Sequence, residues 1–287
     1  MEARTEEESR SNQYLRGRQS GSRSSMNGKW AIITGASSGI GKALAFEFAA
    51  GGFNVVLIAR NKTALAEVAT ECSRRSGVEA EIVATDLSDP NALDGFISRL
   101  SSDSRRYEVL VNNAGFGIHG DFASTDIEQN LRLLNVQLAA ALKLTRAVLP
   151  TMIARRSGHV LNVASVYSFS PVPFQSVYAA CKAFLLSFSS ALGNELKGTG
   201  VRVTVFCPGT TQTEFRSRAR IGQKRTSSGM TAEAAARVAY LETLRGKHIV
   251  VPGLINRLFV FLAQLLPDST VAGLVRFINR QRGQSHS

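Results

Sequence analysis

Residues 30–41 read Trp-Ala-Ile-Ile-Thr-Gly-Ala-Ser-Ser-Gly-Ile-Gly, and this stretch decides the fold. Its apolar first half predicts a short buried strand, which runs into a glycine-rich turn and then into an apolar-periodic helix that ends near Ala50. Strand, glycine turn and helix in this order are the context of a dinucleotide-binding fingerprint. Such glycines let the backbone approach a pyrophosphate, which is held at the N-terminus of the helix. The spacing is GxxxGxG rather than GxGxxG, and we expect a phosphate site here rather than a plain turn.

Short apolar strands alternate with amphipathic helices through the rest of the chain. Strands are expected at residues 54–59, 81–85, 109–111, 159–164, 201–206 and 248–251. This alternation predicts an α/β protein with a Rossmann-type, doubly wound parallel sheet of about seven strands, with helices on both faces, in a single domain. Ligands bind such sheets beyond the carboxyl ends of the strands. Six candidate residues stand at those ends: Gly35, Arg60, Asp86, Asn113, Ser165 and Pro208.

The residue after the second strand predicts which cofactor is bound. An acid there would accept a hydrogen bond from the 2′-hydroxyl of the adenosine ribose. Arg60 stands there instead, followed by Asn61 and Lys62. Because a guanidinium suits a 2′-phosphate, we expect NADP(H) rather than a solvated arginine in a turn. Asp86 suits a contact with adenine, and its competing role is as N-cap of the helix that begins near Pro90.

A tyrosine and a lysine four residues apart lie in the helix expected after the fifth strand. Tyr178 and Lys182 would share one face of this helix, one turn apart. A neighbouring cation lowers the pKa of a phenol from its reference value of about 10, so the pair is expected to act as an acid–base device. The spacing alone is weak evidence, since such pairs occur by chance on surface helices.

Taken together, these pieces resemble the short-chain dehydrogenase/reductase family over about residues 28–253, which we take as the reductase domain. The resemblance rests on motifs in the family's order: Thr34-Gly35-xxx-Gly39-x-Gly41, Asn112-Asn113-Ala114-Gly115, Asn135, Ser165, Tyr178-xxx-Lys182, and Pro208-Gly209 followed by Thr211 and Thr213. The joint set is highly specific, and no catalytic position departs from it. The resemblance implies an NADP-preferring enzyme that transfers hydride between the cofactor and a carbonyl or secondary alcohol.

The resemblance also implies a role for each candidate residue. Tyr178 would be the general acid in reduction and the base in oxidation, and Ser165 would donate a hydrogen bond to the substrate carbonyl. Lys182 would hold the nicotinamide ribose and depress the pKa of Tyr178, while Asn135 would organise a water that links Lys182 to solvent. The expected cofactor-binding residues are Gly35, Ser37, Ser38, Gly39, Ile40, Gly41, Arg60, Asp86, Leu87, Asn113, Tyr178, Lys182, Pro208, Gly209, Thr211 and Thr213.

Neighbouring residues compete for some of these roles. Ser168 or Ser170 could take the place of Ser165, and Tyr167 is a rival tyrosine that has no lysine four residues later. His119 follows the fourth strand and is expected to be solvated rather than to touch the substrate.

The composition limits the partners that we expect. The 287 residues carry a formal net charge of +12, and 44% of them are hydrophobic. We attribute the charge to a basic surface that attracts a phosphate-bearing cofactor, because no nucleic-acid module is visible. Three widely spaced cysteines and four unclustered histidines predict neither disulfides nor a metal site, and a cytoplasmic location is expected. Family members are commonly dimers or tetramers, so we expect a homodimer or homotetramer.

Both ends lie outside the resemblance. Residues 1–27 are predicted to be a disordered leader, and Met26 is hypothesised to be the real start. Residues 254–287 are predicted to be a C-terminal helical extension that is too short to span a membrane. We expect it to pack on the substrate pocket or on a partner subunit. The alternative is peripheral membrane contact through residues 254–280, because this end is basic: Arg257, Arg276, Arg280 and Arg282 stand against one acid, Asp268.

The substrate side is the least defined part of the sequence. A basic segment follows Thr213 and contains Arg216, Arg218, Arg220, Lys224 and Arg225. In the family this segment is a lid over the substrate, and here it would either attract an anionic substrate or be a solvated loop. A lipophilic ketone is suggested by Phe169, Val172, Pro173 and Phe174. The competing functions are an NADP-binding regulatory protein with little turnover and a basic membrane-peripheral or nucleic-acid-binding module with vestigial catalysis.

Overall fold

A seven-stranded parallel sheet forms the centre of the computed structural model, which describes residues 28–213 and 229–283. The strand order is β3-β2-β1-β4-β5-β6-β9, which confirms the predicted doubly wound α/β fold. The strands are β1 (Lys29–Thr34), β2 (Asn54–Ala59), β3 (Ala80–Ala84), β4 (Arg106–Asn112), β5 (Gly158–Val163), β6 (Val201–Phe206) and β9 (Ile249–Val250). β4 begins three residues earlier than expected, and β9 is only two residues long.

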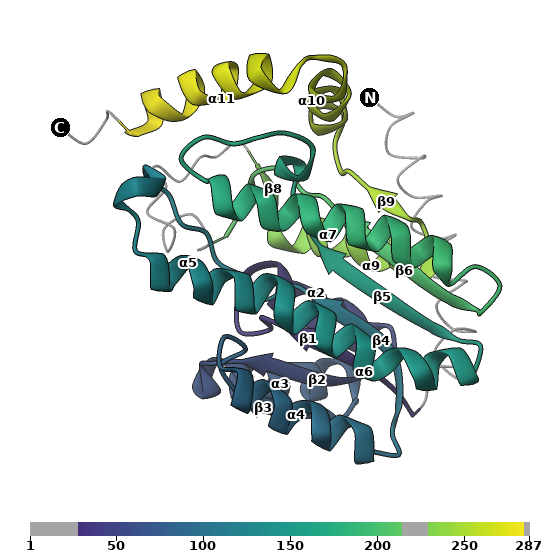
Figure 1. Cartoon of the computed structure of the whole chain (residues 1–287). Coiled ribbons are helices and arrows are strands. Elements are labelled where there is room, and N and C mark those ends of the chain that lie inside the picture. Colours follow the sequence, from purple (N-terminus) through teal and green to yellow (C-terminus); the bar gives the residue numbers. More distant parts are fainter. Residues whose placement is uncertain (1–27, 214–228, 284–287) are drawn as a thin grey trace, which may run out of the picture.

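Helices cover both faces of this sheet (Figure 1). One face carries α2 (Gly39–Ala50), α3 (Lys62–Ser76) and α9 (Ala232–Arg245), and the other carries α4 (Pro90–Ser102), α6 (Ala140–Ala154) and α7 (Ser176–Glu195). Successive residues of β1 point to opposite faces, so Ile33 joins the core under α2 while Ile32 joins the core under α6. Because both faces are buried, the strand is apolar throughout rather than alternating with polar residues.

The helix expected at residues 127–154 is interrupted where Asn135 lies. α5 (Ile127–Leu134) and α6 are joined by a π-helical turn (Asn135–Ala139). Such single turns frequently mark functional sites, because the extra residue redirects the side chains around it. The segment Ile127–Ala154 and α7 are as long and apolar as membrane spans, yet α6 and α7 both pack against strands of the sheet.

Three further features position the loops around the sheet. Single 3₁₀ turns occur at Phe122–Ser124 and Val166–Phe169. A second, two-stranded sheet was not predicted from the sequence and pairs β7 (Thr211–Gln212) with β8 (Met230–Thr231). It brackets residues 214–228, so the predicted basic lid lies outside the described residues, as do the predicted leader 1–27 and Met26.

Two helices end the described chain, α10 (Leu254–Leu265) and α11 (Asp268–Gly283). Both lie at one end of the molecule, above α7 and the loop that precedes it (Figure 1). Ala263, Val271 and Val275 pack against Val172 of that loop and Ala179 of α7. The extension therefore packs on the chain's own body, against the residue that follows Tyr178.

Candidate functional site

The glycine-rich turn lies at the carboxyl end of β1, as predicted. Gly35 and Gly39 have positive φ angles of 68° and 56°, which other residues rarely adopt. A Cβ atom on Gly41 would lie 2.2 Å from the carbonyl oxygen of Gly35, so only glycine fits there. Ser38 occupies the N-cap position of α2, and the first backbone N–H groups of this helix are the ones that can receive a phosphate.

Asn113 holds the glycine turn to the loop after β4. Its Nδ2 atom donates to the carbonyl oxygen of Thr34 at 2.8 Å. The Thr34 hydroxyl in turn accepts hydrogen bonds from the backbone N–H groups of Asn113 and Ala114, both at 2.9 Å. These bonds hold the glycine turn against the loop after β4. Asn113 therefore stabilises the turn itself, a role that the resemblance did not imply.

Arg60, Asp86 and Arg132 gather where an adenosine would lie. Arg60 is exposed after β2, and Asp86 follows the neighbouring strand β3. Partial burial acts to raise the pKa of Asp86, but hydrogen bonds from Ser88 and the charges of Arg60 and Arg132 lower it below its ordinary value. The two arginines are thus close enough to act on the same carboxylate.

The competing role of Asp86 as a helix cap is wrong. Asp89 is the N-cap of α4, and its carboxylate accepts from the backbone N–H groups of Asn91 and Ala92. Asp86 instead accepts from the hydroxyl of Ser88 at 2.7 Å. Leu87, between them, is buried in the core under α4 and α6. An Asp86 carboxylate that caps nothing keeps acceptor capacity for a ligand.

Ser165, Tyr178 and Lys182 converge at the carboxyl end of β5. Tyr178 and Lys182 lie one turn apart on α7 and are only 9% and 5% exposed. The hydroxyl of Ser165 is hydrogen-bonded to the Tyr178 phenol and also accepts from the backbone N–H of Tyr167 at 3.2 Å. The Lys182 ammonium donates to the carbonyl oxygen of Val163, the last residue of β5, at 2.9 Å. Two hydroxyls and one ammonium group are therefore held within one buried cluster.

The pKa that was expected for Tyr178 is wrong for this state of the protein. Burial raises the pKa of Tyr178 above its ordinary value, and the hydrogen bond with Ser165 only partly offsets that rise. The Lys182 ammonium lies 5.5 Å from the centre of the Tyr178 ring and is directed to Val163. Burial also lowers the pKa of Lys182 from 10.5 to about 8. Desolvation is thus the largest cause of both pKa shifts, and the phenol stays protonated at neutral pH.

The rival serines and the rival tyrosine have other surroundings. The hydroxyl of Ser168 donates to the backbone carbonyl of Lys182 at 2.8 Å and supports the helix. Ser170 is buried, with no hydrogen-bond partner for its hydroxyl within the described residues. Tyr167 is close enough to act electrostatically on Tyr178, and it packs against α10 and α11. Of these three serines, Ser165 is the one whose hydrogen bond to Tyr178 contributes to the pKa of the phenol, so it stays the candidate substrate-binding serine.

Asn135 lies on the π-helical turn, but its side chain does not reach Lys182. Its Nδ2 atom donates to the carbonyl oxygen of Ser88 at 3.3 Å, on the adenosine side. Its own carbonyl oxygen accepts from the backbone N–H of Ala140. The expected water link between Asn135 and Lys182 therefore stays a prediction with no direct contact to support it.

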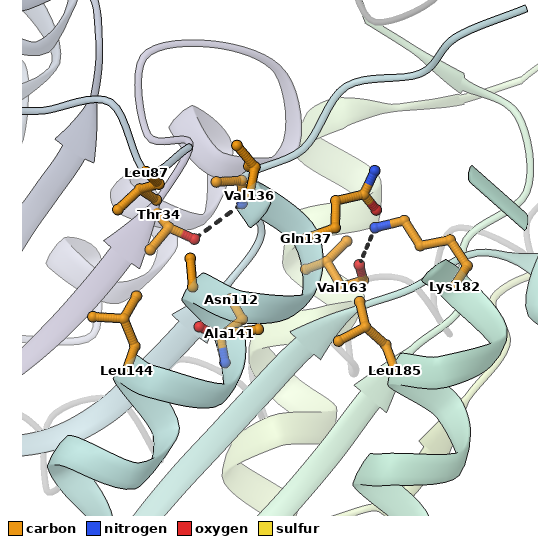
Figure 2. A pocket seen from close by; sticks show the side chains of 12 residues that line it. Thr34, Leu87, Asn112, Val136, Gln137, Ala141, Leu144, Val163, Lys182 and Leu185 are labelled. Carbon is orange, nitrogen blue, oxygen red and sulfur yellow. Dashed lines mark hydrogen bonds between the residues drawn. The ribbon is translucent and has the colours of Figure 1, made fainter. Parts of the chain in front are cut away.

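Gln137, on the same turn, is the residue that the sequence reasoning missed. It is 2% exposed, and its side chain points toward the Lys182 ammonium (Figure 2). Its Nε2 atom donates to Phe116, while its Oε1 atom and the Oδ1 atom of Asn112 have no partner among the described residues. The side chains of Gln137, Asn112 and Lys182 line a cavity of about 10 Å³, close to the space that one water requires. The sequence signal that could have identified Gln137 is its position two residues after Asn135 in a predicted helix.

The chain after β6 contacts both the loop after β5 and the glycine turn. Pro208 accepts a hydrogen bond from the N–H of Val166, the residue after Ser165. Gly209 lies against Asn256 of α10, since a Cβ atom there would be 2.3 Å from the Asn256 side chain. A methyl group of Thr213 lies beside Gly39 of the glycine turn. The segment that contains Thr211 and Thr213 thus lies between the glycine turn and the cluster of Ser165, Tyr178 and Lys182.

The rings of His119, in the loop after β4, and Phe174, in the loop before α7, lie next to each other. Their ring centres are 6.1 Å apart, and the N–H of Gly120 donates to the carbonyl oxygen of Phe174 at 2.9 Å. Phe174 has a φ of 68°, a strained value for an aromatic residue. His119 is half-buried, rather than solvated as expected, and burial lowers its pKa.

Comparison with known proteins gives a consistent set of similarities. Residues 29–224 match the family model described as short chain dehydrogenase. The chain is 32% identical to the ketoacyl reductase HetN of a Nostoc species over 223 residues, which are 77% of this chain and 77% of that protein.

Two solved structures resemble this fold closely. One is a short-chain dehydrogenase from Sphingobium yanoikuyae in complex with NADPH, with a TM-score of 0.76 and 33% identity, covering 86% of this chain and 95% of that one. The other comes from a study of 7β-hydroxysteroid dehydrogenase stereoselectivity, with a TM-score of 0.79 and 28% identity, covering 88% of this chain and 99% of that one.

Proposed function

We propose that this chain, which belongs to the short-chain dehydrogenase/reductase family, is an NADP(H)-dependent carbonyl reductase or alcohol dehydrogenase. Family membership establishes an oxidoreductase that uses NAD(P) and acts on an alcohol or a carbonyl group. The preference for NADP(H), the catalytic roles and a lipophilic substrate are our proposals. The observation that best supports the catalytic roles is the buried cluster of Ser165, Tyr178 and Lys182, and the position of Arg60 beside Asp86 supports the preference for NADP(H).

The proposed chemistry follows from what each residue can hold or move. Bound NADPH would supply a hydride to the carbonyl carbon of the substrate, and the carbonyl oxygen would then gain negative charge. The hydroxyl of Ser165 donates a hydrogen bond to that oxygen, and the phenol of Tyr178 donates its proton. The raised pKa of Tyr178 suits this acid role, because the phenol carries its proton at neutral pH. Lys182 would supply a positive charge to hold the ribose of the bound cofactor.

An activity panel tests the proposed reaction. NADPH absorbance is followed with ketones of graded chain length and ring size, and the purified protein is expected to oxidise NADPH with at least one lipophilic ketone. Tight NADPH binding without turnover on any carbonyl would favour the competing function, an NADP-binding protein with little activity. The steroid enzyme among the similar structures makes bulky cyclic ketones a sensible part of this panel.

Arg60→Asp is expected to reverse the cofactor preference. Arg60 follows β2 and is exposed beside Asp86, where a 2′-phosphate would lie, and a charge-assisted hydrogen bond contributes about 1.5–3 kcal/mol. Its loss should raise the KM for NADPH by roughly 10- to 100-fold while the KM for NADH stays level or falls. Steady-state kinetics with both cofactors measure this shift.

The control for that substitution makes the same change in net charge at another place. Arg75→Asp lies at the far end of α3, the helix that follows Arg60, where Arg75 is paired with Glu71, and it is expected to leave both KM values unchanged. An equal loss of NADPH and NADH affinity in Arg60→Asp would contradict a selective 2′-phosphate contact.

We also propose that the chain forms a homodimer or homotetramer. Apolar side chains are exposed on α5, α6 and α7, away from the sheet: Leu131, Leu142, Ile153 and Phe184. Exposed apolar residues on adjacent long helices suit a helix-to-helix interface between copies. Light scattering after gel filtration gives the mass, and a monomer at working concentrations would refute this assembly.

A further inference from the structure

α10 has two opposite apolar faces, and only one of them is buried. Val260 and Ala263 pack onto the body of the protein. The residues of the other face are 46–85% exposed, and they recur at helical spacing: Leu254, Ile255, Leu258, Phe261, Leu262 and Leu265. We call these six residues the α10 stripe. Soluble domains rarely leave so many large apolar side chains contiguous and exposed, so the stripe requires an occupant.

The helix that follows extends this surface. Val271 and Val275 of α11 are buried against the loop at Val172, while Leu274 and Phe277 are more than half exposed. α11 is joined to α10 by the short segment Leu266–Pro267, and Leu266 is exposed as well. The two helices therefore present one elongated apolar surface at the end of the molecule that Figure 1 shows above α7.

The charges around this surface have one sign. α10 contains no acidic residue, and its exposed Arg257 stands on the flank of the stripe. Arg276 is exposed on α11, and the one acid of the described part of the extension is Asp268 at the start of that helix. Apolar and aromatic side chains bordered by arginine are the pattern of helices that lie in the interface of an anionic bilayer. The chain's net charge of +12 adds a long-range attraction to such a surface.

The length of α10 fits lying on a membrane but not crossing one. Twelve residues make a helix of about 18 Å, well short of the roughly 30 Å of a hydrocarbon core. Its buried face is also tied to the protein body, because Arg257 donates to the carbonyl oxygen of Val251 at 3.0 Å and Asn256 donates to Pro252 at 2.6 Å. The helix is thus held with the α10 stripe facing outward.

The same helices border the proposed active site. Asn256 of α10 lies against Gly209 at the nicotinamide end, and Val271 and Val275 of α11 pack against Ala179, the residue after Tyr178. Tyr167, which acts electrostatically on Tyr178, packs in the same cluster. A partner surface that binds α10 and α11 would therefore lie beside Gly209 and Ala179, next to the proposed active site.

We propose that the α10 stripe docks on an anionic lipid bilayer and that the enzyme takes a carbonyl substrate dissolved in that bilayer. The docking stands independently of the reaction, while the substrate class rests on the proposed function. Apolar burial and electrostatic attraction together supply the free energy of binding to the bilayer. A lipophilic ketone then passes from the bilayer to the active site without entering the water phase.

Vesicle co-sedimentation tests the docking. Full-length protein is expected to pellet with vesicles of phosphatidylcholine and phosphatidylglycerol, to pellet weakly with phosphatidylcholine alone, and to be released by added salt. The double variant Leu258→Glu/Phe261→Glu should reduce binding by at least about tenfold, because it removes two large apolar groups and adds two negative charges. Phe122→Glu/Ile127→Glu makes the same chemical change at two exposed apolar residues outside the extension and outside the proposed subunit interface, and it should pellet like wild type.

Three results would overturn the docking. The first is no pelleting with anionic vesicles, and the second is equal pelleting of both double variants. The third is a change of solution mass in Leu258→Glu/Phe261→Glu alone, which would make the α10 stripe an interface with a second copy of the chain. Circular dichroism checks that each variant is folded.

The substrate class has a separate readout. NADPH oxidation is compared with a short water-soluble ketone and with a long-chain ketone carried in the vesicles. Leu258→Glu/Phe261→Glu should reduce the short ketone at the wild-type rate and the vesicle-borne ketone at least about tenfold more slowly. Pelleting without turnover on any ketone would reject the proposed function and leave the docking intact. Equal rates of both forms on the vesicle-borne ketone would reject delivery from the bilayer.

Discussion

Tyr178→Phe is expected to reduce turnover by roughly 10²–10⁴-fold, the usual contribution of a positioned general acid, while the Kd for NADPH stays within about twofold of wild type. The phenol of Tyr178 is bonded to Ser165 and carries its proton at neutral pH, so it can pass that proton to the substrate oxygen as negative charge develops there. Phenylalanine keeps the ring that packs beside Leu133 and Cys181 and removes the hydroxyl alone. Stopped-flow or steady-state NADPH oxidation measures the rate, and fluorescence titration measures the binding.

Two other tyrosines make the assignment specific. Tyr240→Phe is the matched control. Tyr240 of α9 packs against Phe48 of α2, on the opposite face of the sheet from Tyr178, so this variant is expected to have wild-type activity. Tyr167→Phe tests the rival, since Tyr167 lies in the same cluster as Tyr178. A large loss in Tyr167→Phe together with an active Tyr178→Phe would transfer the acid role to Tyr167. Loss of NADPH affinity in Tyr178→Phe would contradict a purely chemical role.

Lys182→Met is expected to lower the turnover and, at the same time, to remove an unfavourable contribution to the free energy of folding. Turnover should fall by roughly two orders of magnitude, as it does when a preorganised charge beside the reacting atoms is removed. The folded protein without cofactor, however, holds the wild-type ammonium at a buried position where desolvation opposes its charge. Methionine has a similar length and no charge, so this penalty disappears, although the carbonyl oxygen of Val163 then loses its donor.

The pH dependence separates the buried ammonium from that lost hydrogen bond. The pKa of Lys182 is lowered from 10.5 to about 8 in the folded protein. Between these pH values the unfolded chain binds more protons, so the stability of the wild type rises with pH, whereas Lys182→Met lacks this contribution. The free energy of unfolding of the variant minus that of the wild type should therefore fall by about 3 kcal/mol between pH 8 and pH 10.5.

Chemical denaturation of the cofactor-free proteins at a series of pH values measures this difference. Lys143→Met is the control, because Lys143 is exposed on α6, where its ammonium lies 2.6 Å from Asp94. Its difference from wild type should stay level across the same window. A level difference for Lys182→Met as well would contradict the lowered pKa and place the ammonium in contact with water.

The sequence was sufficient for the sheet and for the order of the site residues. Gly35, Arg60 and Ser165 follow apolar strands, and parallel strands bring their carboxyl ends to one edge whatever the helices between them do. Local rules also placed β2 and β6 at their observed residues. The β7–β8 pair escaped prediction because two-residue strands carry no periodic signal.

Properties that depend on neighbours far along the chain could not be predicted in this way. The spacing of Tyr178 and Lys182 gave their proximity, but the pKa of each depends on burial and on the carbonyl oxygen of Val163, which β5 supplies. Asp86 and Asp89 are equally suited to cap α4 by residue type, and only the backbone geometry decides for Asp89. Gln137 gained its place beside Lys182 from the π-helical turn, which no sequence rule anticipated.

β1 lies in the middle of the sheet, between β2 and β4. Since a ribosome releases the chain from its N-terminus, β1 can pair with β2 early, but its other edge waits until residues 106–112 have emerged. During that interval an apolar strand edge is open to the same edge of another nascent chain. Rapid overproduction should therefore direct much of the protein into inclusion bodies, whereas slower synthesis in the cold or additional chaperone should raise the soluble yield.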